Sequence, residues 1–191
     1  MRMPMWPVLL TAGALAVSCG ACGAASAGDS PAAKASIVGR WQQTHKCTWL
    51  VHALRQAHLR PLAPGVIGDY FPNKTPQQLA RKRHLCRGAT PQRHSHFFTS
   101  DGGFGSVDQH GQQVDEDPYR VINGRTVKIG NVRFHYRITA GDELLALQPV
   151  ITNRMRREAL ADPLEFSDAG WSVAVAYPGH TWKRVSCGHW C

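Results

Sequence analysis

Two histidines separated by one residue are the clearest candidates for chemistry in this chain. His94-Ser95-His96 opens a run with β-strand character, and residues two apart in a strand point to the same face. Two imidazoles on one face can ligate a metal ion, and His110 or His135 could complete the site. The alternative is that His94 and His96 are polar residues at the solvated start of a strand. We favour this alternative, so we expect no cofactor and no enzymatic activity. Metal binding by His94 and His96 is the competing hypothesis.

Other catalytic motifs do not occur in the sequence. It contains neither a G-x-S-x-G nucleophile motif nor a glycine-rich phosphate loop. The segment 101–105 (DGGFG) is rich in glycine, but strand-like runs flank it, which favours a hairpin turn. The acidic segment 115–117 lacks the ligand spacing of a calcium-binding loop. These absences favour a binding or structural role over catalysis.

The first 27 residues have the pattern of an export signal. Arg2 precedes an apolar run at 7–17, which is shorter than the roughly 20 residues that a membrane-spanning helix needs. The segment 16–19 (AVSC) resembles the lipobox of bacterial lipoproteins. Residues 1–18 would then be the signal, Cys19 would carry a lipid, and the small residues of 19–36 would form a flexible tether. Cleavage after Ala27 would instead release a secreted protein.

This leader predicts where the protein works. With a lipid on Cys19, the protein stays at the outer face of the cell membrane, and the lipid is its only contact with the bilayer. We favour lipidation because it gives the small residues between the signal and the domain a function as a tether. Secretion without an anchor is the alternative.

Four cysteines lie beyond the leader and the tether, namely Cys47, Cys86, Cys187 and Cys191. An even number of cysteines in an exported chain predicts two disulfides. We prefer the pairs Cys47–Cys86 and Cys187–Cys191, because the first would close a helical insertion and the second would close the C-terminal segment. Pairing between the tail and the first two cysteines stays open. Export also makes a disulfide at the tail a better interpretation than zinc.

The charge of the chain is strongly positive. The sequence has 22 Lys and Arg residues against 13 Asp and Glu residues, a formal net charge of +9. The basic residues gather at 81–87 and 154–157. Such a charge favours anionic surfaces, such as cell-wall polymers or phospholipid headgroups, and it also keeps a protein soluble. We expect no nucleic-acid partner, because no nucleic-acid-binding motif accompanies the charge.

The residues from 37 onward predict one domain of short strands joined by tight turns. Asn123-Gly124 between two β-rich runs is a strong hairpin signal, and 132–139 alternates apolar with polar residues. Helical patterns are expected within an insertion at 44–88, near 50–57 and 77–86, and again at 153–161, and 109–118 is expected to be a polar loop. About nine strands are expected, at 37–43, 94–100, 104–108, 119–122, 125–129, 132–139, 143–148, 171–177 and 181–185.

These patterns predict a mostly β domain over 37–191, built as an antiparallel up-and-down meander. A barrel is favoured over a sandwich because a closed barrel leaves no free sheet edge. Gly39-Arg40-Trp41 in the first strand resembles the G-x-W opening of lipocalin-like (calycin) barrels. The resemblance implies that Trp41 closes one end of the barrel and packs against Lys183 or Arg184 near the last strand.

The C-terminal half also resembles small exported proteins of high-GC Gram-positive (actinobacterial-type) bacteria. We therefore expect an exported, non-catalytic binding protein whose barrel mouth holds a small apolar or amphipathic molecule under the helical insertion. A barrel without a cavity would contradict this expectation. The alternative is a structural or interaction module of the cell envelope, whose basic helices contact anionic polymers or a partner protein.

Overall fold

A computed structural model describes residues 36–139, 141–165 and 167–191, which belong to one compact unit. The expected export signal at 1–18 or 1–27, the lipidation site Cys19 and nearly all of the tether at 19–36 lie outside the described residues. No helix in the described part of the chain combines the length and the apolar character needed to cross a bilayer.

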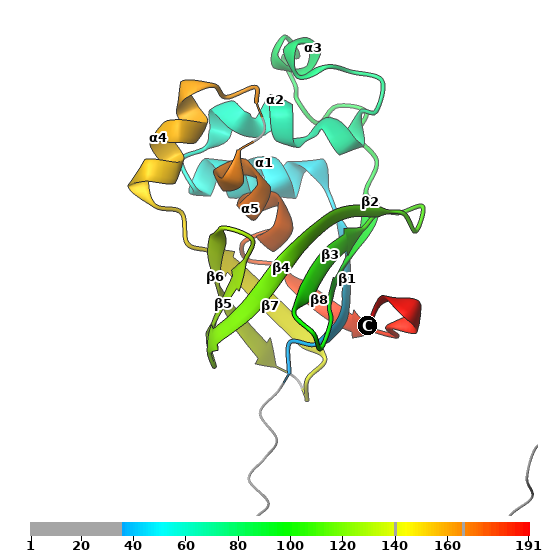
Figure 1. Cartoon of the computed structure of the whole chain (residues 1–191). Coiled ribbons are helices and arrows are strands. Elements are labelled where there is room, and N and C mark those ends of the chain that lie inside the picture. The colour runs from blue at the N-terminus through cyan, green and yellow to red at the C-terminus, as the bar shows by residue number, and fades with distance from the viewer. Residues whose placement is uncertain (1–35, 140, 166) are drawn as a thin grey trace, which may run out of the picture. The chain divides into compact units, whose positions relative to one another are not determined.

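Eight antiparallel strands close into one barrel, as the sequence predicts (Figure 1). Each strand pairs with the next in the chain, and the last pairs with the first, so the sheet has no free edge. The strands are β1 (Gly39–His45), β2 (Gln92–Phe98), β3 (Gly103–Val107), β4 (Gln113–Asn123), β5 (Thr126–Ile129), β6 (Val132–Thr139), β7 (Leu144–Pro149) and β8 (Thr181–Val185).

The longer helices gather over one end of the barrel (Figure 1). The first group follows β1, where the sequence predicts an insertion, and the second lies between β7 and β8. The elements are α1 (Cys47–Gln56), η1 (Arg60–Leu62), α2 (Ala63–Val66), η2 (Gly68–Tyr70), α3 (Pro76–Ala80), α4 (Asn153–Ala161) and α5 (Asp168–Ala176), with η3 (Gly188–Trp190) near the C-terminus.

The helix α3 begins where the sequence predicts but ends earlier. Thr75 and Gln78 form the expected capping box, in which each side chain bonds the backbone of the other residue. The helix stops at Ala80, so the basic residues at 81–87 lie in turns and not on a helix. The expectation of a basic helix at 77–86 is therefore wrong for its second half.

The segment 171–176 belongs to the helix α5, and the prediction of a strand at 171–177 is wrong. Ser167 caps the helix α5 by accepting a hydrogen bond from the backbone of Gly170 at 3.2 Å. The run that follows is buried on nearly every side, so its hydrophobicity has no helical period to distinguish it from a buried strand. This difference reduces the nine expected strands to eight.

The predicted polar loop at 109–118 is also partly wrong, because β4 begins at Gln113. The register between β3 and β4 shifts there: Val107 lies opposite Gln113 and Ser106 lies opposite Asp115, which leaves Val114 as an extra residue. Polar side chains hid this strand from the sequence pattern. The bulge matters because Asp115 shares the face of Ser106, which is the barrel interior.

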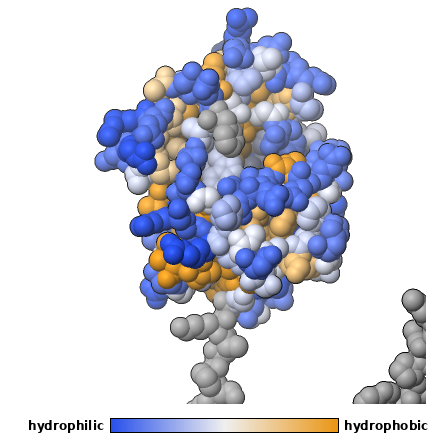
Figure 2. Space-filling model, in the orientation of Figure 1, coloured by the Kyte–Doolittle hydropathy of each residue, from blue (hydrophilic) through white to orange (hydrophobic). Residues whose placement is uncertain are grey.

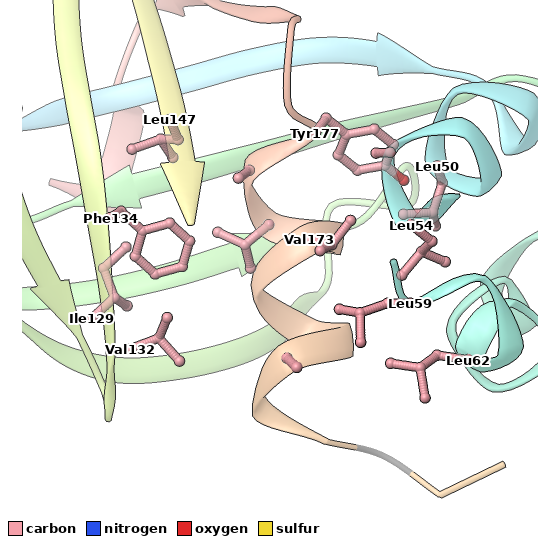
Figure 3. Close-up of a cluster of buried hydrophobic side chains, with 14 of the residues drawn as sticks. Leu50, Leu54, Leu59, Leu62, Ile129, Val132, Phe134, Leu147, Val173 and Tyr177 are labelled. Atoms are coloured by element: carbon pink, nitrogen blue, oxygen red, sulfur yellow. The ribbon is translucent and has the colours of Figure 1, made fainter. Parts of the chain in front are cut away.

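The helix α5 joins two parts of one hydrophobic core. Figure 3 shows Val173 between side chains of the barrel, such as Phe134, and leucines of the helical insertion, such as Leu54 and Leu59. All four side chains are fully buried. The helix α5 therefore packs into the end of the barrel that faces the helices, here called the mouth, and covers much of it. The helical insertion packs on α5.

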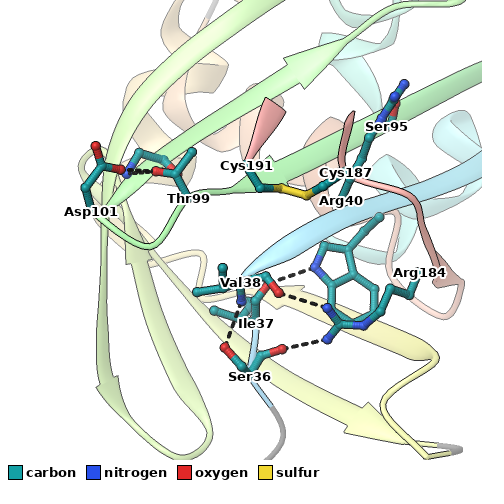
Figure 4. The surroundings of a disulfide bond; sticks show 12 residues. Ser36, Ile37, Val38, Arg40, Ser95, Thr99, Asp101, Arg184, Cys187 and Cys191 are labelled. Atoms are coloured by element: carbon teal, nitrogen blue, oxygen red, sulfur yellow. Dashed lines mark hydrogen bonds between the residues drawn. A yellow bond between two sulfur atoms is a disulfide. The ribbon is translucent and has the colours of Figure 1, made fainter. Parts of the chain in front are cut away.

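Both disulfides that we preferred from the sequence are present in the structure. Cys47–Cys86 spans the insertion, with a Cα–Cα distance of 5.6 Å. Cys187–Cys191 closes the C-terminal segment, with a Cα–Cα distance of 5.5 Å (Figure 4). The alternative pairing between the tail and the insertion is excluded.

The end of the barrel opposite the helices is closed by Trp41 and Arg184. The Trp41 ring is fully buried, and its Nε1 donates to the backbone oxygen of Ile37 at 2.8 Å. The guanidinium of Arg184 lies 4.1 Å from the ring centroid and donates to the backbone oxygens of Ser36 and Val38, each at 2.8 Å (Figure 4). Of the two basic residues considered, Arg184 makes this contact.

Gly39 is required at this end by both space and backbone shape. Its φ of +138° is rare for any residue with a side chain, and a Cβ there would collide with the guanidinium of Arg184. The G-x-W motif therefore has a local physical basis here. The eight-stranded meander and this closed end are consistent with a lipocalin-like barrel.

Candidate functional site

A cavity of about 430 Å³ lies between the barrel mouth and the helices. On the barrel side its lining comes from β1, β2, β3 and the bulge in β4, and on the helical side from α1, α2, η2, α3, α5 and the segment before α5. The volume is in the range of sites that hold small molecules. The chain therefore does not form the cavity-free barrel that would contradict a binding role.

His94 and His96 point to the same face of β2, as their spacing predicts, and both line this cavity. Their ring centroids lie 5.1 Å apart, and His96 is only 1% exposed. The interpretation that we favoured from the sequence, in which both lie at a solvated strand start, is wrong. The side chains face the barrel interior because β2 pairs with β1 so that His96 lies opposite the buried Trp41.

The hydrogen bonds of His96 fix its protonation. Its Nε2 lies 3.0 Å from the backbone oxygen of Val175, which can only accept, so Nε2 carries the proton. Its Nδ1 then accepts from the hydroxyl of Ser106 at 2.9 Å. Both ring nitrogens are occupied, and neither has a lone pair left for a metal ion.

Metal binding at His94 and His96 stays a prediction that gains no support from this geometry. Within the described ranges, no group of three or more His, Cys, Asp or Glu side chains is arranged to hold a metal ion. His110 and His135, which we considered as further ligands, are exposed and do not line the cavity.

A cluster of one histidine and two tyrosines lies beside these residues, and it was not among the sites predicted from the sequence. The Nδ1 of His45 is hydrogen-bonded to the hydroxyls of Tyr70 and Tyr177, with the second at 2.9 Å, and the two hydroxyls lie 3.2 Å apart. His45 ends β1, Tyr70 ends η2 and Tyr177 follows α5. The alternation of Trp41, Gln43 and His45 was the only sequence signal that could have placed His45 inside.

The floor of the cavity is electrically neutral. Burial, together with the nearby His94, lowers the pKa of His45 to about 3, and burial lowers the pKa of His94 to about 4. Burial also holds the pKa of His96 well below its ordinary value, and raises the pKa of Tyr70 to about 12. At neutral pH these groups are uncharged imidazoles and phenols, which can form hydrogen bonds but offer no charge.

Several polar groups near this floor have no hydrogen-bond partner among the residues that the structure describes. His94 forms no hydrogen bond with the described residues, and its ring lies between His45 and His96. The Nε2 of Gln43 and the Nε1 of Trp182 are buried donors without a partner in the same part of the chain. Buried polar groups normally have a partner, so water or a ligand atom is expected beside them.

The rim of the cavity carries the carboxylates of Asp69, Asp115 and Glu165. Asp115 accepts a hydrogen bond from the Nε1 of Trp171 at 2.6 Å. Burial raises the pKa of the Asp115 carboxyl, although the bond from Trp171 acts in the opposite direction. Partial burial and the charge of Asp108 raise the pKa of Asp69.

The other residues singled out from the sequence lie away from the cavity. Gly39, Trp41 and Arg184 close the opposite end, and the four disulfide cysteines do not line the cavity. Among the aromatic residues that the sequence offers as pocket candidates, Trp171 lines the cavity. The remaining ones belong to the core or pack against it: Trp41, Phe98, Phe104, Phe134, Tyr136 and Trp182.

No protein-family model matches this chain, and a comparison with curated proteins gives no significant match.

Proposed function

We propose that this protein is a non-catalytic binding protein that holds a small amphipathic molecule in the cavity between barrel mouth and helices. The observation that carries the proposal is the cavity of about 430 Å³ with a neutral, hydrogen-bonding floor and partly apolar walls. Such a lining fixes the orientation of a ligand through a few polar contacts, while apolar surface supplies most of the binding free energy.

The protonation of the floor supports binding over catalysis. A nucleophilic or general-base role needs a group whose pKa lies near the working pH. The pKa values of the buried histidines lie far below neutrality, and those of Tyr70 and Tyr177 lie above their ordinary range. His96 also has both nitrogens engaged by Val175 and Ser106.

Export and lipid anchoring through Cys19 are part of this proposal. The two disulfides support export, because disulfides persist mainly in oxidising compartments outside the cytoplasm. A lipid on Cys19 would hold the barrel near the outer membrane face through the segment at 19–36. Mass spectrometry of the protein from its own cells tests this point: a diacylglyceryl adduct on Cys19 is expected, and a mature chain starting at Gly28 would contradict it.

The alternative role, a cell-envelope module that contacts anionic polymers through basic helices, has less support. The basic residues at 81–87 lie outside a helix. On α4, Arg154 pairs with Glu158 at 3.2 Å, and Arg156 donates to the backbone oxygen of Ala57. These two basic side chains already have partners within the domain.

Filling the cavity tests the proposed function. Ala174 lines the cavity from α5, and Ala161 is an exposed alanine on α4 that does not line it. We expect the neutral fluorescent probe N-phenyl-1-naphthylamine to bind the unmodified protein. Ala174→Phe should weaken this binding by about tenfold or more, because the new ring occupies the space. Ala161→Phe is the matched control and should change nothing.

Two results would contradict the proposed function. One is an unmodified protein that does not bind the probe. The other is a folded Ala174→Phe variant that binds it as tightly as the Ala161→Phe control does. Circular dichroism of both variants shows whether each is folded.

A further inference from the structure

The cavity has a charge opposite to that of the protein as a whole. The chain has an excess of nine basic residues, yet no Lys or Arg is among the described residues that line the cavity, whereas three carboxylates are. Figure 2 shows that hydrophilic residues cover most of the viewed face of the domain. The cavity therefore differs from the surface in the sign of its charge.

Asp115 is the best-positioned of the three carboxylates. It follows the bulge residue Val114 and lies opposite Ser106, on the interior side of β4. The Nε1 of Trp171 holds one oxygen, Oδ2, at 2.6 Å, which fixes the orientation of the carboxyl group. The backbone N–H of Glu116 also bonds this carboxylate, and no described side chain other than Trp171 does.

Asp69 and Glu165 approach the same rim from two other parts of the chain. Asp69 belongs to η2, and Glu165 lies between α4 and α5. Neither forms a salt bridge with any other described residue; the pair Arg154–Glu158 is the one that the described ranges contain. With three acidic residues and no Lys or Arg among its described lining residues, the cavity attracts a cation more than an anion.

Aromatic side chains lie beside these carboxylates. Trp171, Tyr70 and Tyr177 line the cavity, and the face of an aromatic ring attracts an organic cation. The imidazoles of the floor do not oppose a cation, because they are neutral. An anion would meet the rim carboxylates and no basic side chain.

We propose that the ligand is a small organic amine, with its ammonium group among Asp69, Asp115 and Glu165 and its apolar body against Trp171 and Val175. This inference rests on the proposed function and names its ligand class. The cavity defines the site, and the carboxylates define its charge preference. Fatty acids and other anionic amphiphiles are correspondingly poor ligands.

Three probes that differ only in their head group test the preference: tryptamine, tryptophol and indole-3-acetate. The first is a cation at neutral pH, the second is neutral and the third is an anion. By titration calorimetry at neutral pH and moderate salt, tryptamine should bind about tenfold or more tightly than indole-3-acetate, with tryptophol between them. The net charge of the protein predicts the reverse order for non-specific binding, so the expected order can arise only locally.

Variants of the rim carboxylates test whether these residues cause the preference for the cationic probe. Asp115→Asn keeps an oxygen that can accept from Trp171 and removes the charge, and Glu165→Gln removes the charge of an exposed residue. The double variant should lose most of the tenfold preference, while tryptophol affinity changes by less than about twofold. Glu143→Gln, at the exposed turn residue just before β7 near the closed end, is the matched control and should leave all three affinities unchanged.

The possible failures of the two proposals are distinguishable. If the cavity binds N-phenyl-1-naphthylamine but prefers indole-3-acetate, or does not bind tryptamine, the amine inference is wrong and the binding function stands. If the preference persists in the folded double variant, the rim carboxylates are not its source and the inference is again wrong. If neither the indoles nor the fluorescent probe binds, both proposals fail. If the double variant does not fold, the single Glu165→Gln variant takes its place, with a partial loss of preference expected.

Discussion

The two ends of this barrel are built on opposite principles. At the closed end, Arg184 donates to three backbone oxygens and lies against Trp41, whose own Nε1 is bonded to Ile37. At the mouth, by contrast, His94 has no partner within the described chain, and the rim carboxylates have no basic partner. The polar groups named at the closed end have partners within the protein, whereas His94 and the carboxylates of the mouth lack the partners named above among the described residues.

This difference separates stability from binding. Each polar group that is satisfied internally contributes to a single, rigid arrangement, whereas an unsatisfied one costs free energy unless something binds it. The closed end therefore stabilises the barrel, and the polar groups of the mouth are the ones that a ligand can contact. Substitutions at the closed end should change unfolding, and those at the mouth should change ligand affinity.

The largest effect is expected from Trp41→Ala. Removing a fully buried indole should lower the free energy of unfolding by about 3–5 kcal/mol, because a cavity opens at the closed end. Urea unfolding followed by circular dichroism measures the loss. Trp190→Ala is the control: this half-buried ring stacks on Phe97 outside the barrel interior, and its removal should cost clearly less. Equal losses would mean that Trp41 has no special role in closing the barrel.

The two disulfides should differ in their effect on stability. Replacing Cys47 and Cys86 with alanine should destabilise the protein by about 4 kcal/mol, and replacing Cys187 and Cys191 by about 2 kcal/mol. The reason is the length of chain that each bond constrains in the unfolded state, 39 residues in sequence against 4. Thermal unfolding of the two double variants provides the comparison. A larger loss at the tail would contradict this account and would point to strong packing of η3.

Acid should destabilise the mouth through its buried histidines. The pKa of each of His45, His94 and His96 is lowered in the folded state, so the unfolded chain binds more protons. Stability is therefore full above the ordinary value of about 6.5 and falls as pH decreases toward about 3. At about pH 5, each fully buried imidazole should account for roughly 2 kcal/mol of the loss.

Urea unfolding at neutral pH and at about pH 5 measures this loss. His96→Gln should reduce the difference between the two conditions by roughly 2 kcal/mol. His135→Gln on β6 is the exposed control and should leave the difference unchanged. A pH dependence that is the same in both variants would mean that His96 is not protonated on unfolding in this range.

Arg184→Met tests the hydrogen bonds of the closed end more gently. The methionine keeps part of the packing on Trp41 but loses the bonds to Ser36, Val38 and Asp142, which should cost about 1–3 kcal/mol. Arg184→Lys should not restore them, because an ammonium group lacks the planar fork. Lys183→Met, at the exposed neighbouring position, should have little effect. Full rescue by lysine would show that charge alone is needed.

The smallest effect on stability is expected from His94→Phe. No hydrogen bond to the described residues is lost, so the free energy of unfolding should change by less than about 1 kcal/mol, while probe affinity in the cavity changes. Parallel unfolding and binding titrations check this separation. A loss as large as that of Arg184→Met would mean that His94 supports the fold, and the contrast between the two ends would then be wrong.

The sequence predicted most of the barrel, because strands and turns leave local patterns. The alternation at 132–139 and the turn Asn123-Gly124 placed β4, β5 and β6, and Gly39 and Trp41 marked the closed end. The helix α5 was missed because a fully buried helix and a fully buried strand have the same uniform hydrophobicity. The first part of β4 was missed because its side chains are polar.

Sequence patterns could not predict the cavity. His45 and Tyr177 meet although 132 residues separate them, and Asp115 and Trp171 meet across 56 residues. The spacing of His94 and His96 predicted their shared face but not that the face is the interior. That choice depends on the register between β1 and β2.

The sequence by itself determined a mostly β, disulfide-bonded domain with a G-x-W closed end, because hydrophobic period, turn residues and cysteine number act locally or along the chain. Only the tertiary structure decided that the mouth is a cavity with a neutral floor and an acidic rim. The physical reason is that burial, pKa and unpaired charge depend on which distant side chains share a space, and not on their order in the chain.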